Sequence, residues 1–346
     1  TYVDEVPPPG ANIVDLMWIF RVKRPPGSLE PPAAGHGLRQ APREWHDTLR
    51  TMIAALGFAP STTHPSLFLR TDPTQPPFYI IVYADDLVFA TADTWALALV
   101  KAELQKRHTC NELRELRRYL WLQITQERAR CTINLTQSHM VHQVLQRFGF
   151  QFSSPQRTPL PIGYSLSAPH SDKSVEPSGP YPELVGCLMY LMTCTRPDLA
   201  NPLSILARFI APGRHRKEHW TAAQRVLRYL CSTSGMGLVL GGWGSMVLKA
   251  HSDASWGNDH ATLWSCEAEI YVGALAAQKL RWLTYLVTDL GERPRPPPVL
   301  YFDNKAMIAL CREQRLEHIT KHIALHYFLA RVLQHRGQLR LSYVAS

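Results

Sequence analysis

The stretch Phe78–Thr91, with the sequence FYIIVYADDLVFAT, constrains the fold of this chain more than any other segment. Two runs of β-forming residues flank Ala84, Asp85 and Asp86, a pattern that predicts a β-hairpin with two acids at its bend. Because neighbouring strand residues point to opposite faces, Asp85 and Asp86 cannot both lie in one core. The bend is therefore expected to leave both carboxylates accessible.

Accessible carboxylates at such a bend are suited to magnesium, a hard cation that prefers oxygen ligands. Two such ions, about 3.5–4 Å apart, can activate a hydroxyl nucleophile and stabilise a leaving pyrophosphate. The alternative interpretation is an ordinary solvated Asp-Asp turn. Tyr83, which precedes Ala84, and the apolar strands on both sides favour the functional interpretation.

A second set of acids lies in the C-terminal third of the chain. Asp253 follows a predicted strand in KAHSDASW, and Asp303 stands where a predicted strand passes into a helix. Glu267 and Glu269 fall in the first turn of a long predicted helix. Carboxylates from three separate elements can converge around two magnesium ions. Each acid also has a structural alternative, because acids are favoured at helix N-termini and Asp303 can cap a helix.

The apolar periodicity elsewhere predicts an α+β chain. Helices are expected over residues 39–56, 94–108, 138–148, 183–192, 201–209, 217–230, 266–290, 305–312 and 322–335. Strands are expected over 119–125, 131–135, 299–302 and 338–344, with a second hairpin formed by 237–240 and 246–251 around GGWGS. Residues 152–180 are rich in Ser, Pro and Gly and are interpreted as a linker.

Composition narrows the class of partner. The sequence has 37 Lys and Arg residues and 28 Asp and Glu residues, which give a net charge of +9. This charge suits a polyanionic partner, and the alternative is a basic soluble protein without such a partner. The sequence has no run of eighteen apolar residues, so no membrane span is expected. The seven cysteines form no C-x-x-C pair, which favours buried thiols over disulfides or a zinc module.

Taken in order, these motifs resemble copia-type retrotransposon polyproteins. YADD is similar to the aromatic-x-Asp-Asp signature of reverse transcriptases, and GLRQAPREWHDTL resembles the segment that precedes it. LTQSHMVHQVLQRFGF, YPELVGCLMYLMTCTRPDLA and KEHWTAAQRVLRYL resemble later segments that lead to RNase H. Asp253, the acid-Ala-acid of Glu267–Glu269 and Asp303-Asn304 follow the order of the family's RNase H domain.

The resemblance implies a partial right-hand palm and thumb followed by a partial RNase H-like α/β domain. Residues 1–34 would be a remnant of the fingers, 35–151 the palm and thumb, 152–235 linker and connection helices, and 236–346 the RNase H-like domain.

By the same resemblance, Asp85 and Asp86 bind magnesium and Tyr83 lies beside the primer end. Gln40 lies near the incoming nucleotide or the template, with a surface residue at a helix start as an equal alternative. In the RNase H-like part the expected catalytic metal ligands are Asp253, Glu269 and Asp303, where Glu269 is preferred to Glu267.

The resemblance also implies binding partners and a cellular location. The expected partners are an RNA template, a DNA primer, an RNA–DNA hybrid and deoxynucleoside triphosphates, without a membrane. Related polymerases work in cytoplasmic particles before their DNA enters the nucleus. The oligomeric state stays open.

Four departures from the family predict weak or absent activity. No strand with an early palm Asp precedes GLRQAP, and its loss is expected to leave a sheet edge unpaired. The stretch between Asp253 and Glu269 is short, so part of that sheet should be missing, and the sequence stops at YVAS, before the family's last catalytic Asp. Trp121 stands where the family has Gly, a substitution expected to strain the packing. The alternatives to an enzyme are a non-catalytic nucleic-acid-binding remnant and a pseudogene product without a stable fold.

Overall fold

The structure of the protein is a computed structural model that describes residues 16–23, 41–164, 166, 179–211, 214–242, 246–252, 265–312 and 324–345. The chain divides into two compact units, and each is described by itself. One unit contains Thr1–Ile19 and Leu113–Trp243, and the other contains Phe20–Glu112 and Gly244–Ser346.

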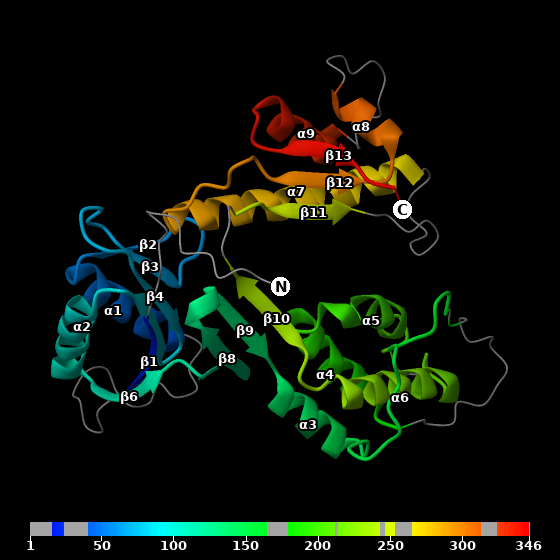
Figure 1. The fold of residues 1–346 in the computed structure, drawn as a ribbon, viewed down its shortest axis with the longest axis horizontal. Coiled ribbons are helices and arrows are strands. Elements are labelled where there is room, and N and C mark those ends of the chain that lie inside the picture. The colour runs from blue at the N-terminus through cyan, green and yellow to red at the C-terminus, as the bar shows by residue number, and fades with distance from the viewer. Residues whose placement is uncertain are drawn as a thin grey trace. The chain divides into compact units, whose positions relative to one another are not determined.

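A six-stranded sheet, largely in the second unit, has the strand order β2-β3-β4-β5-β1-β6 (Figure 1). Its strands are β1 (Leu16–Lys23), β2 (Phe58–Pro60), β3 (Leu67–Arg70), β4 (Phe78–Tyr83), β5 (Asp86–Thr91) and β6 (Thr109–Glu115). Along β4, buried Phe78, Ile80 and Val82 alternate with more accessible residues, as a half-buried strand requires.

The expectation of an unpaired sheet edge is wrong for β5. The strand order places β4 on one side of β5 and β1 on the other. The apolar, β-branched segment LMWIFRVK supplies β1, so a segment far from the hairpin in sequence completes the ladder of hydrogen bonds.

Two helices accompany this sheet, and both were predicted from the sequence. Helix α1 (Ala41–Ala55) buries Leu49, Met52 and Ile53 and is followed by Gly57, whose φ of 86° suits a helix stop. Helix α2 (Thr94–Arg107) begins after Asp93, whose carboxylate accepts a hydrogen bond from the Ala96 amide at 2.9 Å.

The first unit combines an antiparallel sheet with a helical core. The sheet has the order β10-β9-β8-β7, formed by β7 (Arg118–Tyr119), β8 (Leu122–Glu127), β9 (Thr132–Thr136) and β10 (Gly237–Gly241). The helices are α3 (Ser138–Arg147), α4 (Tyr181–Cys194), α5 (Ala200–Ala207) and α6 (Lys217–Ser232). Their apolar faces meet in one core that includes Val144, Leu188, Leu203, Val226 and Leu230.

The predicted hairpin around GGWGS is wrong. Strand β10 pairs antiparallel with β9, whereas β11 (Lys249–Ser252) pairs parallel with β12 (Val299–Phe302). A Cβ at Gly237 would lie 2.1 Å from the Leu135 carbonyl oxygen, and one at Gly241 would lie 2.3 Å from the Cys131 carbonyl oxygen. The two glycines therefore permit β10 to approach β9 closely, which a residue with a side chain would obstruct.

The C-terminal part of the second unit is a parallel sheet with three helices. Strands β11, β12 and β13 (Arg340–Tyr343) form it in that order, and helix α7 (Ser265–Asp289) runs alongside the strands (Figure 1). Helices α8 (Lys305–Arg312) and α9 (Ala324–His335) complete it. Leu300, Phe302, Leu333 and Leu341 lie in its core.

The cysteines whose side chains the structure describes are thiols, as expected: Cys110, Cys131, Cys187, Cys194, Cys231 and Cys311. Of these, Cys311 is buried and the others are partly exposed, so the expectation of burial holds for Cys311 alone. Within the described residues, every helix is too short or too polar to span a membrane.

Candidate active site at the Asp85–Asp86 hairpin

The predicted hairpin between Phe78 and Thr91 is confirmed. Strands β4 and β5 pair antiparallel from Phe78↔Thr91 to Tyr83↔Asp86, which leaves Ala84 and Asp85 as a two-residue loop. Ala84 has a φ of 49°, a left-handed conformation that is uncommon for a residue with a side chain.

The two acids differ in accessibility. Asp85 lies in the exposed loop, and Asp86, the first residue of β5, is partly buried. Tyr83 is 56% exposed on the opposing strand. Val82 and Leu87 are buried directly beneath this end of the hairpin, so the strands are anchored while the polar groups face outward.

The donor atoms suit a hard divalent cation. Magnesium is usually held by one or two protein carboxylates, with water and substrate phosphates completing its shell. Asp85 and Asp86 provide two carboxylates on consecutive residues and therefore fit such an ion. The described residues contain no group of three or more His, Cys, Asp or Glu side chains placed to hold a metal. The neighbouring strand β1 has the sequence LMWIFRVK, which contains no acid.

An interaction missed by the sequence analysis holds the loop from outside the hairpin. The indole Nε1–H of Trp45, on α1, donates a hydrogen bond to the Ala84 carbonyl oxygen at 3.0 Å. The helical spacing of Trp45, Leu49 and Met52 indicates an apolar face and contains no signal for this donor role. Only the folded arrangement of α1 against the hairpin reveals it.

The C-terminal acids are described in part. Asp303 directly follows β12, is separated from α8 by Asn304, and is partly buried. The register pairs Ser252 with Phe302 and Phe302 with Tyr343, so the three strands end at the same edge of the sheet.

The remaining predicted residues are not placed. Glu267 and Glu269 lie in the first turns of α7, but their side chains are outside the described set. Asp253 and Gln40 lie outside the described residues altogether. The convergence of Asp253, Glu269 and Asp303 therefore stays a prediction.

Comparison with known proteins identifies relatives for most of the chain. The family described as reverse transcriptase (RNA-dependent DNA polymerase) matches residues 20–161. The retrovirus-related Pol polyprotein from transposon RE2 of Arabidopsis thaliana is 31% identical, over 90% of this chain and 23% of that protein. The corresponding polyprotein from transposon TNT 1-94 of Nicotiana tabacum is 28% identical, over 84% of this chain and 24% of that protein. The chain thus spans about a quarter of the length of these relatives.

A solved structure shares the fold. The foamy viral protease-reverse transcriptase in complex with double-stranded DNA aligns with 95% of this chain and 57% of its own, at a TM-score of 0.51 and 12% identity. The similarity confirms a mixed helix and sheet architecture of the kind found in retroviral reverse transcriptases.

Proposed function

We propose that this chain, whose residues 20–161 belong to the reverse transcriptase family, is an RNA-directed DNA polymerase region joined to an RNase H-like region, with impaired catalysis. Its relatives are copia-type Pol polyproteins. In this proposal Asp85 and Asp86 hold Mg²⁺, Tyr83 lies beside the primer end, and Gln40 lies near the nucleotide or template. Asp253, Glu269 and Asp303 are the proposed metal ligands of the RNase H-like region.

The observation that carries the polymerase assignment is the hairpin itself. The hairpin holds Asp85 in its two-residue loop and Asp86 at the start of β5, above the buried Val82 and Leu87. A magnesium ion held there would favour deprotonation of a bound hydroxyl and neutralise charge on the phosphates. The protein's own part is to hold the two carboxylates in fixed positions.

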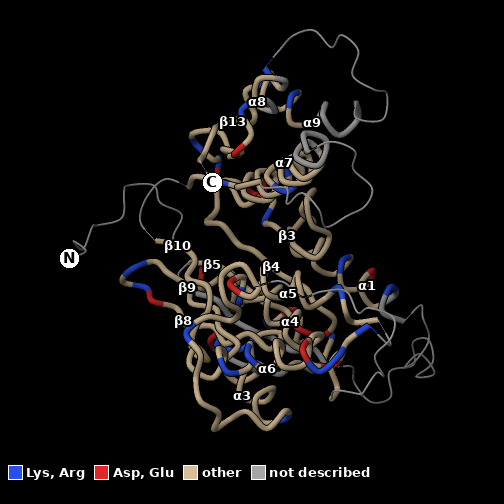
Figure 2. Tube along the Cα trace, turned by 90° about the vertical axis from the view of Figure 1, so that its right-hand side faces the viewer, with Lys and Arg blue, Asp and Glu red and all other residues tan. Residues whose placement is uncertain are grey.

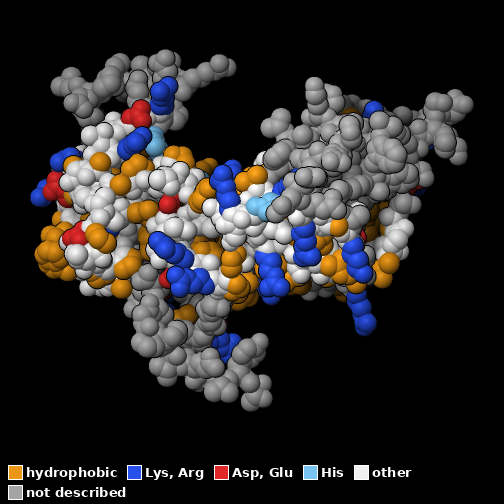
Figure 3. Space-filling view, turned by 90° about the horizontal axis from the view of Figure 1, so that it is seen from above, with side chains coloured by type: hydrophobic (Ala, Val, Ile, Leu, Met, Phe, Trp, Pro, Cys, Tyr) orange, Lys and Arg blue, Asp and Glu red, His pale blue; other side chains and the backbone are white. Residues whose placement is uncertain are grey.

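Electrostatics supports a nucleic-acid partner. The net charge of +9 favours binding to phosphate backbones through counterion release. Lys and Arg occur along several elements, among them α1, α6 and the β8–β9 hairpin (Figure 2). On the face drawn in Figure 3 they are spread among neutral and hydrophobic side chains and are more frequent than Asp and Glu. The proposed ligands are an RNA template with a DNA primer, the RNA–DNA hybrid, and deoxynucleoside triphosphates.

Impairment is proposed because the strand beside the hairpin contains no acid. Strand β1 is the neighbour of β5, and its sequence LMWIFRVK offers no third carboxylate to the hairpin. Loss of a single group at a catalytic centre typically lowers the rate by roughly 10²-fold or more. A reduced rate is thus expected even where Asp85 and Asp86 bind metal.

The RNase H-like assignment has separate support. Three parallel strands end at one edge, and Asp303 follows the middle strand there. Asp253 directly follows Ser252, the last residue of β11, in the sequence. Carboxylates at the ends of adjacent strands are suited to a shared metal site.

Extension of a DNA primer on an RNA template in Mg²⁺ tests the proposal. The whole chain is compared with a variant carrying Asp85→Asn and Asp86→Asn, and with the matching region of the RE2 relative. We expect extension at least about 10²-fold slower than that of the relative, and none from the double variant.

Three other results would contradict parts of the proposal. Extension as fast as that of the relative argues against impairment, and extension that survives both substitutions argues against the hairpin as the site. A folded chain that binds the hybrid with salt-dependent affinity but never extends the primer is a binding remnant rather than a polymerase.

A further inference from the structure

The loop that carries Asp85 has a backbone conformation that its own sequence disfavours. In a two-residue hairpin loop with a positive φ at the first position, glycine is the preferred residue. Here that position is Ala84, with a φ of 49°. A non-glycine residue keeps such a conformation only where its surroundings hold it. Contacts from outside the hairpin are therefore expected to stabilise the loop.

Trp45 provides such a contact. Its Nε1–H donates to the carbonyl oxygen of Ala84 at 3.0 Å, across 39 residues of sequence. The acceptor belongs to the residue with the disfavoured φ, and that residue directly precedes Asp85. A single side chain on α1 is thus tied to the backbone that orients the first acid.

The indole is itself held in place. Its ring meets the His108 ring edge to face, with centroids 5.4 Å apart and an interplanar angle of 87°. Leu49 and Ile53, one and two turns further along α1, are almost fully buried and fix the helix on the sheet. The donor group of Trp45 therefore approaches the loop from a rigid support.

We infer that Trp45 is a positioning residue for the Asp85–Asp86 pair. Through the Ala84 carbonyl it keeps the loop in its left-handed conformation and so sets the directions of the two carboxylates. In this role Trp45 acts through the Ala84 carbonyl oxygen and not as a metal ligand. The inference rests on the proposed metal-binding function, because it specifies how the metal ligands are oriented. Outer partners of this kind typically change metal affinity by about 10–100-fold when removed.

Trp45→Phe tests the inference, because phenylalanine keeps an aromatic ring beside His108 but removes the N–H donor. The matched control is Trp95→Phe, since Trp95 lies on α2 with its side chain 73% exposed. Two quantities are measured on the whole chain: hydrogen exchange of the amides of Asp85–Leu87, and Mn²⁺ affinity from the paramagnetic resonance signal of the free ion. In Trp45→Phe we expect exchange in the loop to accelerate and Mn²⁺ affinity to fall about tenfold, with no change in Trp95→Phe.

A second substitution separates positioning from general destabilisation. Glycine adopts the left-handed conformation without strain, so Ala84→Gly makes the loop less dependent on the Trp45 hydrogen bond. Added to Trp45→Phe, it should bring Mn²⁺ affinity back toward the wild-type value. A loss caused by a weakened core would not be recovered by a change in the loop.

The failure of this inference is distinguishable from failure of the proposed function. Equal Mn²⁺ binding by the wild type and by the variant carrying Asp85→Asn and Asp86→Asn would contradict the metal site itself. In that case hydrogen exchange of the loop amides alone decides the role of Trp45. Unchanged loop exchange in Trp45→Phe overturns the positioning role, whatever the metal measurements give.

Discussion

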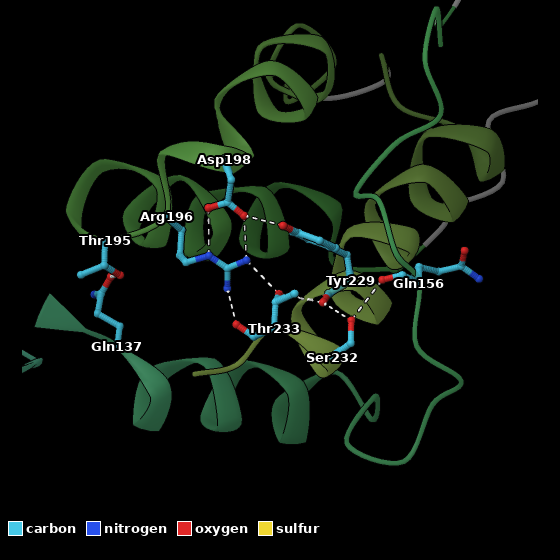
Figure 4. A network of polar contacts seen from close by, with 8 residues as sticks. All are labelled: Gln137, Gln156, Thr195, Arg196, Asp198, Tyr229, Ser232 and Thr233. Atoms are coloured by element: carbon cyan, nitrogen blue, oxygen red, sulfur yellow. Dashed lines mark hydrogen bonds and ion pairs between the residues drawn. The ribbon is translucent and has the colours of Figure 1, made fainter. Parts of the chain in front are cut away.

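Arg196 and Asp198 form a bidentate ion pair in which the guanidinium is buried. The Nε and Nη2 atoms of Arg196 donate to the two carboxylate oxygens of Asp198 at 2.9 and 2.8 Å (Figure 4). The Arg196 side chain is 1% exposed, and it also donates to the carbonyl and hydroxyl oxygens of Thr233. Tyr229 donates to the same carboxylate at 2.9 Å. The network joins the segment after α4 to the end of α6, which gives the TRPD sequence a structural role.

Removing the guanidinium should destabilise this unit strongly. Arg196→Ala leaves the partly buried carboxylate without its partner, a change that typically costs about 3–5 kcal/mol. Lysine cannot form the bidentate pair, so Arg196→Lys should fall between alanine and the wild type. Urea unfolding measures the free energy of unfolding of both variants. The control is Arg208→Ala, because Arg208 is exposed at the end of α5, and it should change this free energy by less than about 0.5 kcal/mol. Equal stability of Arg196→Ala and Arg208→Ala would contradict the role of the network.

The same pair predicts a loss of stability in acid. Burial alone would raise the pKa of Asp198, but the hydrogen bonds from Arg196 and Tyr229 outweigh it and hold the pKa below its ordinary value of 3.8. The stabilisation is therefore present above pH 3.8 and is lost as the pH falls through the lower, folded-state pKa. Urea unfolding between pH 5 and pH 3 should show a steeper loss for the wild type than for Asp198→Asn. Parallel profiles would argue against this assignment.

His219 predicts a second pH dependence, at higher pH. Its Nδ1 accepts a hydrogen bond from the Arg216 backbone N–H at 3.0 Å, and its ring lies 4.1 Å from that of Phe209 between centroids. Burial lowers the pKa of His219 below 6.5. The charge of Glu218 opposes this shift, and the charges of His215 and Arg216 lower the pKa further. Protonation would also remove the acceptor at Nδ1. Stability is thus fully present above pH 6.5 and declines as the pH falls below it.

Glutamine at position 219 separates titration from capping. Gln at this position can still accept from the backbone N–H but does not titrate, so His219→Gln should flatten the decline between pH 7.5 and 5.5. His142→Gln, at an exposed site on α3, is the control and should leave the profile unchanged. Some slope should remain in His219→Gln, because burial also lowers the pKa of His108. Identical slopes in the two variants would contradict the prediction.

Trp121 predicts a stabilising substitution. Leu120 and Trp121 form the loop between β7 and β8, and their φ values of 48° and 70° are both left-handed. The expected strain is present in the backbone rather than in packing, because Trp121 is 65% exposed. Trp121→Gly should raise the free energy of unfolding by about 1 kcal/mol, whereas Trp121→Ala removes the indole but keeps the strain and should gain little. An equal gain from both would show that loss of the indole, not relief of φ, is responsible.

The sequence predicted those helices and strands that are specified by residues within the element itself. Residues 299–302 are a short apolar run that ends before Asp303, and they form β12 with the expected bounds. The helix over 94–107 follows a capping acid, Asp93, and its carboxylate caps as predicted. The Asp85–Asp86 hairpin is also local, because its two strands are adjacent in sequence.

Features that depend on distant partners were not predictable in this way. The strand-forming character of β10 is local, but its pairing with β9 depends on the close approach of Gly237 to Leu135. The position of β1 beside β5 likewise follows from which sheet edge is available after folding. The Trp45 hydrogen bond joins two segments whose spacing in sequence gives no indication of contact.

Asp85 and Asp86 are proposed to hold a divalent metal, and direct measurement of metal binding tests this proposal. Titration of Mn²⁺ into the chain bound to an RNA template and DNA primer, followed by the paramagnetic resonance signal of the free ion, tests it without requiring turnover. We expect the wild type to bind Mn²⁺ at a site that is absent from the variant carrying Asp85→Asn and Asp86→Asn. Equal Mn²⁺ uptake by the two folded proteins would contradict it.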